Sequence, residues 1–327
     1  MQAEARHSNP TAGIVFIMIA LFAISVNDML IKFLSGGYPL HEIVFVRSAI
    51  GICFSLVLVQ MEGGFRILRT RTPGLHLLRC GMIVVSNMCF FSALAVLPLA
   101  EAVAVFFVAP LMITLLSIPI LGEKVGPMRI GAAAVGFLGV IIMSKPWETG
   151  EAREISLVIY LLPVVAALTY AVNQLLARKL GVASKASAMA FYIQCGFLAV
   201  SAVFWLVAGD GRHAEGLENQ SLIFLLRAWV WPQGPDLWLF VLIGFCSAIV
   251  GYSLSQAYRM ADAATVAPFE YVGLPLAIFW GWVVFGDLPG PVVLVGILLI
   301  FGSGLFVFLR ERQKKRALVS AARLNRR

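Results

Sequence analysis

The 327-residue chain is 60% hydrophobic and 13% charged, with a mean hydropathy of +0.91. Soluble domains are roughly 45–50% apolar and about 25% charged, so this composition excludes an ordinary water-soluble domain and favours the lipid bilayer as solvent. The net charge of +8 does not indicate nucleic-acid binding, because the basic residues lie in short loops and a C-terminal tail that suit contact with anionic lipid.

Ten apolar segments follow one another, each close to the roughly 20 residues that a spanning helix needs. They cover residues 13–34, 42–60, 77–97, 101–121, 128–145, 156–177, 187–208, 237–258, 264–285 and 290–309. Turn-forming clusters such as Gly36-Gly37-Tyr38-Pro39 separate them. The first segment is too long for a cleavable signal peptide, and no Ala-x-Ala site follows it, so we interpret it as the first span. We therefore predict an all-α integral membrane protein with ten transmembrane helices.

One further apolar stretch, Leu222 to Trp231, holds only ten residues and contains Arg227. It is too short to span a bilayer. Its tryptophans and arginine suit an interfacial helix on the membrane surface, and a buried loop segment is the alternative interpretation.

The distribution of basic residues predicts the orientation. With the N-terminus in the cytoplasm, 19 of the 25 basic residues fall in cytoplasmic segments and 4 in external ones, while Lys32 and Arg47 lie in spans. This bias predicts that both termini are cytoplasmic, in agreement with an even number of spans.

The two halves of the chain resemble each other. A shift of 164 residues places Gly122-Glu123 on Gly286-Asp287, and a shift of 146 residues places Asn27 on Asn173. These matches describe two five-helix units. Because five is odd, the second unit is inverted relative to the first. Inverted repeats are typical of transporters that expose one central site alternately to either side. The predicted units cover residues 1–145 and 146–310, and a basic cytoplasmic tail follows at 311–327.

Several stretches distributed along nearly the whole chain carry a family resemblance. They are Asn27-Asp28 with Lys32, Phe45-Val46-Arg47, Ala102 to Glu123, Asp262 to Tyr271, and Phe285-Gly286-Asp287. On these residues the chain resembles the drug/metabolite transporter superfamily in its ten-span EamA-like branch. The resemblance implies a secondary carrier in a bacterial inner membrane, with a midplane site lined by spans one, three, four, six, eight and nine. The stretches look closest to carriers of S-adenosylmethionine and riboflavin, and an amino-acid-like compound is a third expected substrate. The insertion at 209–236 is longer than this branch leads us to expect.

Ionisable residues inside apolar spans are the first site candidates, because a charge at the bilayer centre costs at least about 2.5–3.5 kcal/mol. Asp28 is interpreted as a partner for a substrate cation or as a proton site, or alternatively as the partner of Lys32 one helical turn away. Arg47 is interpreted as a contact for an anionic group or a gating residue. It could instead reach the membrane surface or pair with Glu42.

Glu270 follows Pro268, which removes a helical hydrogen bond, and with Tyr271 it is the best candidate for a polar substrate contact. Its alternative is an ion pair with Arg259. We interpret Glu101 as a residue at the solvated edge of a span. Glu123 and Asp287 are expected to end helices.

Neutral polar and aromatic residues in the spans are the remaining site candidates, with interhelical hydrogen bonding as the alternative role. They are Asn27, Asn87, Asn173, Gln174, Gln256, Tyr170, Tyr271 and Trp280. Glycines at 131, 136, 139, 296, 302 and 304 predict close packing in spans five and ten, which we interpret as scaffold.

The sequence contains no catalytic or cofactor signature. Its four histidines have no metal-ligand spacing, its five cysteines form no Cys-x-x-Cys pair, and a Walker A loop is absent. We therefore expect no enzyme activity, no metal and no cofactor. The expected partners are a small-molecule substrate, lipid and protons, and the sequence leaves a homodimer open. A membrane-embedded enzyme and a non-transporting subunit or receptor are the competing functions.

Overall fold

The computed structural model describes residues 10–122, 125–148, 155–180, 186–260 and 267–324, and all regular secondary structure within these ranges is helical. Eight segments are long and apolar enough to cross a membrane. They are α1 (Pro10–Leu34), α2 (Leu40–Glu62), α3 (Pro73–Leu94), α4 with α5 (Leu99–Phe106 and Ala109–Leu121), α7 (Leu157–Leu180), α8 (Ala186–Ala208), α10 (Asp236–Met260) and α13 (Pro291–Leu324).

Two shorter apolar helices join these eight. They are α6 (Pro127–Met143) and α12 (Gly273–Phe285), the second of which follows the 3-10 helix η4 (Ala267–Val272). The prediction of a multi-pass, all-helical membrane protein is confirmed, whereas the count of ten spans stays a prediction.

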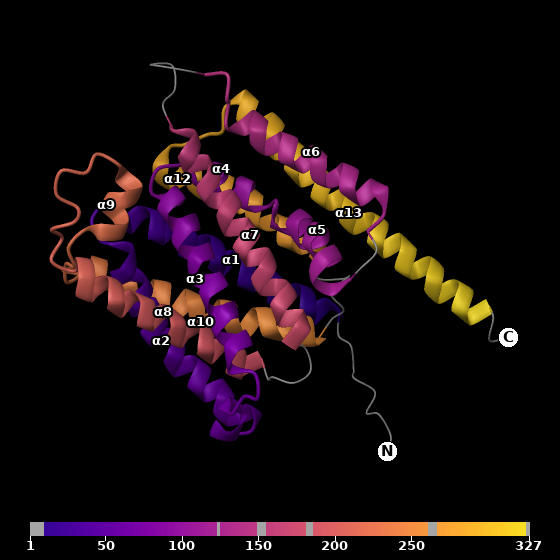
Figure 1. The fold of residues 1–327 in the computed structure, drawn as a ribbon, viewed down its shortest axis with the longest axis horizontal. Coiled ribbons are helices and arrows are strands. Elements are labelled where there is room, and N and C mark those ends of the chain that lie inside the picture. The colour runs from indigo at the N-terminus through magenta and orange to yellow at the C-terminus, as the bar shows by residue number, and fades with distance from the viewer. Residues whose placement is uncertain (1–9, 123–124, 149–154, 181–185, 261–266, 325–327) are drawn as a thin grey trace.

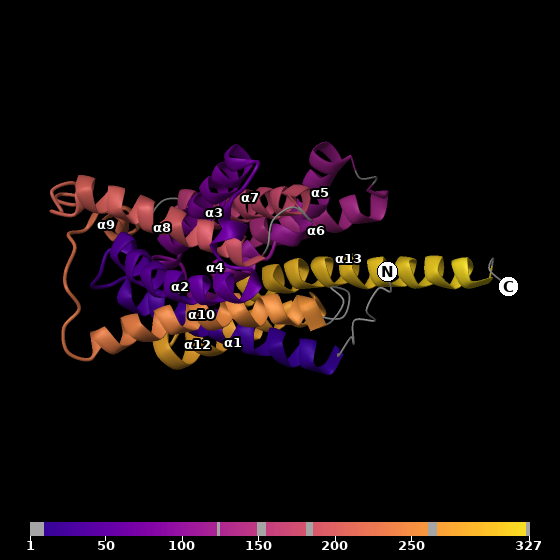
Figure 2. The same cartoon turned by 90° about the horizontal axis from the view of Figure 1, so that it is seen from below.

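The helices pack in pairs that are distant in sequence (Figures 1 and 2). Helix α1 lies along α10, α3 along α7, α2 along α8, and α6 along α13. Helix α13 continues past the predicted end of the tenth span at residue 309 as far as Leu324, so the part of the basic tail that the structure describes is helical. Its C-terminal end projects from one end of the bundle, and the short helix α9 (Gln220–Leu226) lies at the other end (Figure 2).

Glycines end two helices at matched positions. Gly122 follows α5 with φ of 70°, and Gly286 follows α12 with φ of 73°. Both adopt the left-handed conformation that glycine reaches without a Cβ penalty, and each backbone N–H binds a carbonyl of the preceding turn. The predicted helix-ending turns are confirmed at Gly122 and Gly286, while Glu123 lies outside the described residues.

Two apolar segments, one in each half of the chain, have an interrupted helix. Helix α4 ends at Phe106 and α5 begins at Ala109, where Pro110 in the first turn needs no backbone donor. In the second half, η4 gives way to α12 between Val272 and Gly273. Interrupted backbone at membrane depth is tolerated where it is buried in protein or lines a cavity.

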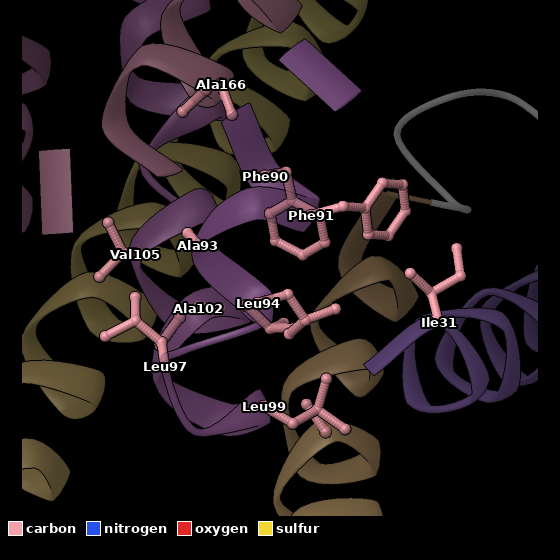
Figure 3. Close-up of a cluster of buried hydrophobic side chains, with 14 of the residues drawn as sticks. Ile31, Phe90, Phe91, Ala93, Leu94, Leu97, Leu99, Ala102, Val105 and Ala166 are labelled. Atoms are coloured by element: carbon pink, nitrogen blue, oxygen red, sulfur yellow. The ribbon is translucent and has the colours of Figure 1, made fainter. Parts of the chain in front are cut away.

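The largest apolar core is centred on α3 and α4 (Figure 3). Phe91 and Leu94 of α3 pack near Ala102 and Val105 of α4, and Ala166 of α7 joins the same cluster. Large apolar side chains also cover the outside of the bundle. Leu77, Leu206, Trp238 and Leu298 are exposed over 66–76% of their surface. An apolar exterior around an apolar core is the pattern expected in lipid.

The insertion at 209–236, hereafter the α9 segment, packs on the helix ends. The Asn219 side chain caps α9 by accepting hydrogen bonds from the backbone of Ser221 and Leu222. Phe224 is 1% exposed, whereas Trp231 is 76% exposed. The helix covers only Gln220–Leu226, so neither a surface helix nor a buried loop describes the whole stretch from Leu222 to Trp231.

Glycines bring α6 and α13 into close contact, so the close packing predicted for spans five and ten is present, and the structure shows that these two helices pack on each other. A Cβ on Gly139 would lie 2.8 Å from the Gly296 carbonyl oxygen, and one on Gly296 would lie 2.7 Å from that of Gly139. Backbone occupies the place of both side chains, so neither position can accept even a methyl group without separating the helices.

We predict that Gly296→Ala lowers the free energy of unfolding by about 1–3 kcal/mol, because the new methyl group overlaps backbone. Thermal unfolding of the purified protein in detergent measures the change. Gly131→Ala is the matched control, since no heavy atom lies within 4 Å of its Cβ position. Equal melting temperatures for the two variants would contradict the close approach.

Candidate functional site

A first polar cluster joins α1 to α10. Asn27 Nδ2 donates to the neighbouring Asp28 Oδ1 at 3.2 Å, and Asn27 Oδ1 accepts a hydrogen bond from Ser247 Oγ of α10 at 3.4 Å. Asn27 is buried and Asp28 is partly exposed. The amide thus orients the carboxylate while α10 orients the amide.

Arg47 of α2 completes this cluster. Its Nη2 donates to Asn87 Oδ1 of α3 at 3.1 Å, and its guanidinium carbon lies 5.6 Å from the ring centre of Phe91 and 5.3 Å from that of Phe197. Aromatic faces attract cations, most strongly where water is excluded. The charges of Asp28 and Arg47 act on each other, although no direct ion pair joins them within the described residues. We call Asn27, Asp28, Arg47, Asn87 and Ser247 the Asp28 cluster.

The alternative partner proposed for Asp28 is wrong. Lys32 instead donates to the carbonyl oxygens of Leu94 and Leu97, at 3.1 and 2.6 Å, and its Nζ lies over the ring of Phe285. The lysine therefore caps the end of α3, and Asp28 is left for other partners.

The local pairing of Arg47 with Glu42 is also wrong, because Glu42 accepts a hydrogen bond from the backbone of Val230. Glu101 is likewise not a solvated edge residue. It is 8% exposed, and its carboxylate accepts a hydrogen bond from Tyr160 at 2.6 Å. Both carboxylates therefore hold helix ends together rather than contacting bulk water.

A second cluster forms between α7 and η4. Gln174 Nε2 donates to the Tyr170 hydroxyl at 2.7 Å, and Glu270 acts electrostatically on both Tyr170 and Tyr271. The alternative ion pair of Glu270 with Arg259 involves a side chain outside the described residues. We call Tyr170, Gln174, Glu270 and Tyr271 the tyrosine cluster.

Neighbouring helices clamp the ring of Tyr271. It stacks on Phe107 at the break between α4 and α5, with centroids 5.8 Å apart, and meets Phe301 of α13 edge-on at 5.1 Å. A Cβ on Gly304 of α13 would overlap the Tyr271 hydroxyl. The tenth segment therefore supports the candidate site as well as the scaffold.

A chain of aromatic rings connects the two clusters. From Phe91, which faces Arg47, ring contacts run through Phe90 and Phe106 to Tyr170, with centroid separations of 5.3, 5.2 and 5.4 Å. Rings at such distances form favourable edge-to-face pairs. The Asp28 cluster thus contains a carboxylate and a guanidinium, the tyrosine cluster contains a carboxylate with hydroxyl and amide groups, and aromatic rings lie between the two clusters.

A cavity lies between α2, α8 and α10. Its lining is Gly51, Phe54, Ser55, Leu58, Glu62, Ser187, Ala190, Gln194, Ser247, Ala248, Gly251, Tyr252 and Gln256. Ser247 belongs to both this cavity and the Asp28 cluster. The predicted site residue Gln256 faces the cavity, opposite Gln194, whose amide nitrogen would lie 2.6 Å from a Cβ on Gly51.

Two predicted site residues lie apart from these groups. Trp280 of α12 donates from Nε1 to Ser25 Oγ of α1 at 3.1 Å and packs beside Phe22, so it joins two helices. Asn173 of α7 is 3% exposed, and its Oδ1 has no hydrogen-bond partner within the described residues.

Sequence reasoning missed the aromatic members of the site. Phe90, Phe91, Phe106 and Phe197 sit in uniformly apolar helices, where no periodicity separates a ring facing a cation from one facing lipid. Adjacent Phe90 and Phe91 were the only local signal. Within the described residues, no three histidine, cysteine, aspartate or glutamate side chains gather to hold a metal ion.

Comparison with known proteins bears on the whole chain. Residues 11–145 match the EamA-like transporter family. The chain is 30% identical to a riboflavin transporter of Vibrio cholerae over 312 residues, which cover 94% of this chain and 96% of that protein. It is 26% identical to an S-adenosylmethionine uptake transporter of Rickettsia prowazekii over 302 residues, covering 92% of this chain and 94% of that protein. A solved crystal structure with 19% identity shares the fold at a TM-score of 0.62, over 93% of this chain and 98% of that one.

We predict that Arg47→Met lowers the free energy of unfolding by about 3 kcal/mol, because it leaves the Asp28 carboxylate without its countercharge. Asp28→Asn combined with Arg47→Met should cost at least about 1 kcal/mol less than the sum of the single changes. Denaturant unfolding in mixed micelles measures this coupling.

Arg66→Met in the exposed 3-10 helix η1 (Phe65–Leu68) is the control and should change stability little. Strictly additive effects of Asp28→Asn and Arg47→Met would show that the two charges do not interact.

Proposed function

This chain belongs to the EamA-like transporter family of the drug/metabolite transporter superfamily, and on that premise we propose that it is a secondary carrier for riboflavin. The observation that carries the substrate proposal is the identity of 30%, over 94% of the chain, to a protein named as a riboflavin transporter. Members of the family are transporters rather than enzymes, which removes the membrane-enzyme alternative.

The interior supports a substrate that combines a flat ring with polar groups and little net charge. Asp28 and Arg47 carry opposite charges, so an uncharged or zwitterionic ligand leaves the buried charge balanced. The rings of Phe90, Phe91 and Phe106 offer stacking or edge contacts to a heterocycle. Hydroxyl and amide groups of the tyrosine cluster suit a polyol or a ring edge.

S-adenosylmethionine is the second candidate, and a specific feature favours it. Asp28 and Glu270 place one carboxylate in each cluster, and either could contact a positively charged sulfonium or ammonium group. The R. prowazekii relative supports the same candidate.

We further propose that the chain works by alternating access between two inverted five-helix repeats. The packing supports this arrangement, because the pair of α1 with α10 corresponds under the repeat to the pair of α7 with α3, and α2 with α8 and α6 with α13 are self-corresponding. The breaks before α5 and α12 and the glycine caps after them also correspond. Discontinuous helices at the midplane are typical of transporter binding sites.

The remaining parts of the proposal concern placement and coupling. Ten spans with both termini in the cytoplasm of a bacterial inner membrane fit the bias of 19 cytoplasmic basic residues against 4 external ones. Proton coupling through Asp28 or Glu270 is proposed because each carboxylate sits in a largely apolar surrounding. Both clusters lie within one chain, so this scheme does not depend on a homodimer.

Purified protein in liposomes tests the substrate proposal. We predict time-dependent riboflavin uptake above that of protein-free liposomes, followed by flavin fluorescence, with labelled S-adenosylmethionine in a parallel arm. Uptake of S-adenosylmethionine alone would reassign the substrate. Uptake of neither compound would contradict the proposal.

We predict that Asp28→Asn and Glu270→Gln each reduce uptake about tenfold or more, the size expected for loss of a charged hydrogen-bonding contact. Glu148→Gln is the control, because Glu148 forms a surface ion pair with Lys145 at 3.3 Å. If a proton gradient leaves uptake by the native protein unchanged, the coupling proposal fails while the carrier proposal stands.

A further inference from the structure

The α9 segment is fastened to the turn between α1 and α2, at the end of the bundle opposite the C-terminal end of α13 (Figure 2). The Tyr38 hydroxyl donates to Asp236 Oδ2 at 2.7 Å, and Arg227 donates to the Ser35 carbonyl oxygen at 3.3 Å. The hydrogen bond to Asp236 is the main reason that the pKa of Tyr38 lies above its usual value. Both contacts join the turn between α1 and α2, in the first half of the chain, to a segment of the second half.

Aromatic packing strengthens this fastening. The Trp229 ring lies 5.7 Å from His41 and 5.4 Å from Phe45, both on α2, and 6.3 Å from Trp205 on α8. Ser221 Oγ donates to the Ser92 carbonyl oxygen of α3 at 2.6 Å. Any movement that opens this end of the bundle between its two halves must therefore break contacts of the α9 segment.

Glu42 lies beneath the segment in an unusual environment for a carboxylate. It is 0% exposed, its Oε2 accepts the backbone N–H of Val230 at 3.1 Å, and its Oε1 has no hydrogen-bond partner among the residues that the structure describes. Within the described part of the chain, no lysine, arginine or histidine forms an ion pair with it. A buried carboxylate with one hydrogen bond and no countercharge is costly when ionised.

The other charged and titratable groups around Glu42 have partners elsewhere. Arg227 binds Ser35, Arg47 faces Asn87, and Asp236 accepts from Tyr38. Around the same segment, aromatic contacts join His41 to Phe204 of α8, Trp229 to Trp205 of α8, and Tyr38 to Phe240 of α10. Among the described residues, no cation therefore forms an ion pair with Glu42 while the segment is closed.

His41 is the one titratable neighbour on the same helix turn. It is 1% exposed, its Nδ1 donates to the Leu225 carbonyl oxygen at 3.2 Å, and its Nε2 has no hydrogen-bond partner in the described part of the chain. The closed segment buries this imidazole and so favours its neutral form, which means that protonation of His41 at low pH should favour the open segment. Protonation of Glu42 at low pH should have the opposite effect and favour the closed segment. The sign of a pH response therefore identifies the responsible group.

We propose that Glu42 is a protonation site that controls the α9 segment: the closed segment holds Glu42 protonated, and opening exposes it to water, where it ionises. The role in gating rests on the proposed carrier function, whereas protonation-linked opening can be measured without transport. The proton is bound from the side of the membrane that the α9 segment faces.

Distance measurement between spin labels at Gly37→Cys and Trp231→Cys tests the proposal. The five native cysteines are replaced by alanine, and the protein is placed in nanodiscs so that both faces share one buffer. Gly37 has no heavy atom within 4 Å of its Cβ position and Trp231 is 76% exposed, so both positions accept a label. His41→Gln removes the opposing titration and keeps a donor for Leu225.

In this His41→Gln protein, the ratio of the population with the open, longer distance to the population with the closed, shorter distance should rise at least tenfold between about pH 5 and about pH 7.5. One linked proton changes this ratio by up to about tenfold per pH unit. Adding Glu42→Gln should abolish the dependence. Adding Glu62→Gln, at the other end of the same helix, should leave it intact. A ratio that is constant with pH before Glu42 is replaced, or that rises on acidification, would overturn the proposal.

Tyr38→Phe provides a second measurement that does not alter Glu42. Loss of the hydrogen bond to Asp236 should raise the open fraction at every pH and leave the slope with pH unchanged. A changed slope would assign the pH response to the Tyr38–Asp236 pair instead. Failure of flavin and S-adenosylmethionine uptake would refute the proposed substrates and leave this result untouched.

Discussion

The guanidinium of Arg47 is the constraint on which the interior depends. A charge buried among apolar helices must be satisfied by groups that other helices supply, because Arg47 is only 8% exposed. That environment is provided by Asn87 and Phe91 of α3 and by Phe197 of α8. The charge of Asp28 on α1 also acts on the guanidinium. Four helices from both halves of the chain are thereby held in register around one cation.

The same need explains the rest of the polar interior. Lys32 binds two carbonyl oxygens at the end of α3, Glu101 accepts from Tyr160, and Asn27 accepts from Ser247. In lipid, where apolar packing alone gives little drive for helix association, such hydrogen bonds specify which helices meet. Asp28 differs from these groups because, among the described residues, no cation forms an ion pair with it and its printed side-chain hydrogen bond comes from its neighbour Asn27.

Two contacts in the bundle differ in kind: α6 and α13 pack closely through glycines, whereas the α9 segment contacts the first half of the chain through side chains. Helices α6 and α13 approach so closely at Gly139 and Gly296 that backbone touches backbone, and α13 supports Tyr271 through Gly304. At the α9 end, the halves meet instead through side-chain hydrogen bonds and aromatic contacts, which can be broken one by one. A carrier that rocks its halves around a central site needs this combination.

Hydrophobic length and the positions of glycine and proline were sufficient to predict an all-helical membrane protein, its helix-ending glycines and the presence of close-packing glycines in the fifth and tenth predicted spans. These features depend on residues near one another in sequence. The candidate residues Asn27, Asp28, Arg47 and Asn87 were also found from sequence, because a polar group in an apolar run stands out locally. The interaction partners of the polar residues were not predicted correctly. The pairings of Asp28 with Lys32 and of Arg47 with Glu42 were wrong, as was the placement of Glu101 at a solvated edge.

The amino-acid sequence by itself determined that the chain is a membrane protein, which of its residues are costly to bury in lipid, and which segments form its apolar helices. Only the tertiary structure decided which costly groups share a cluster, which phenylalanines face Arg47, and that Glu42 is sealed beneath a segment about 190 residues away in sequence. The physical reason is that solvation cost belongs to each residue alone, whereas its compensation depends on which distant helix lies opposite, and an apolar helix shows no preference for one neighbour until packing brings specific side chains together.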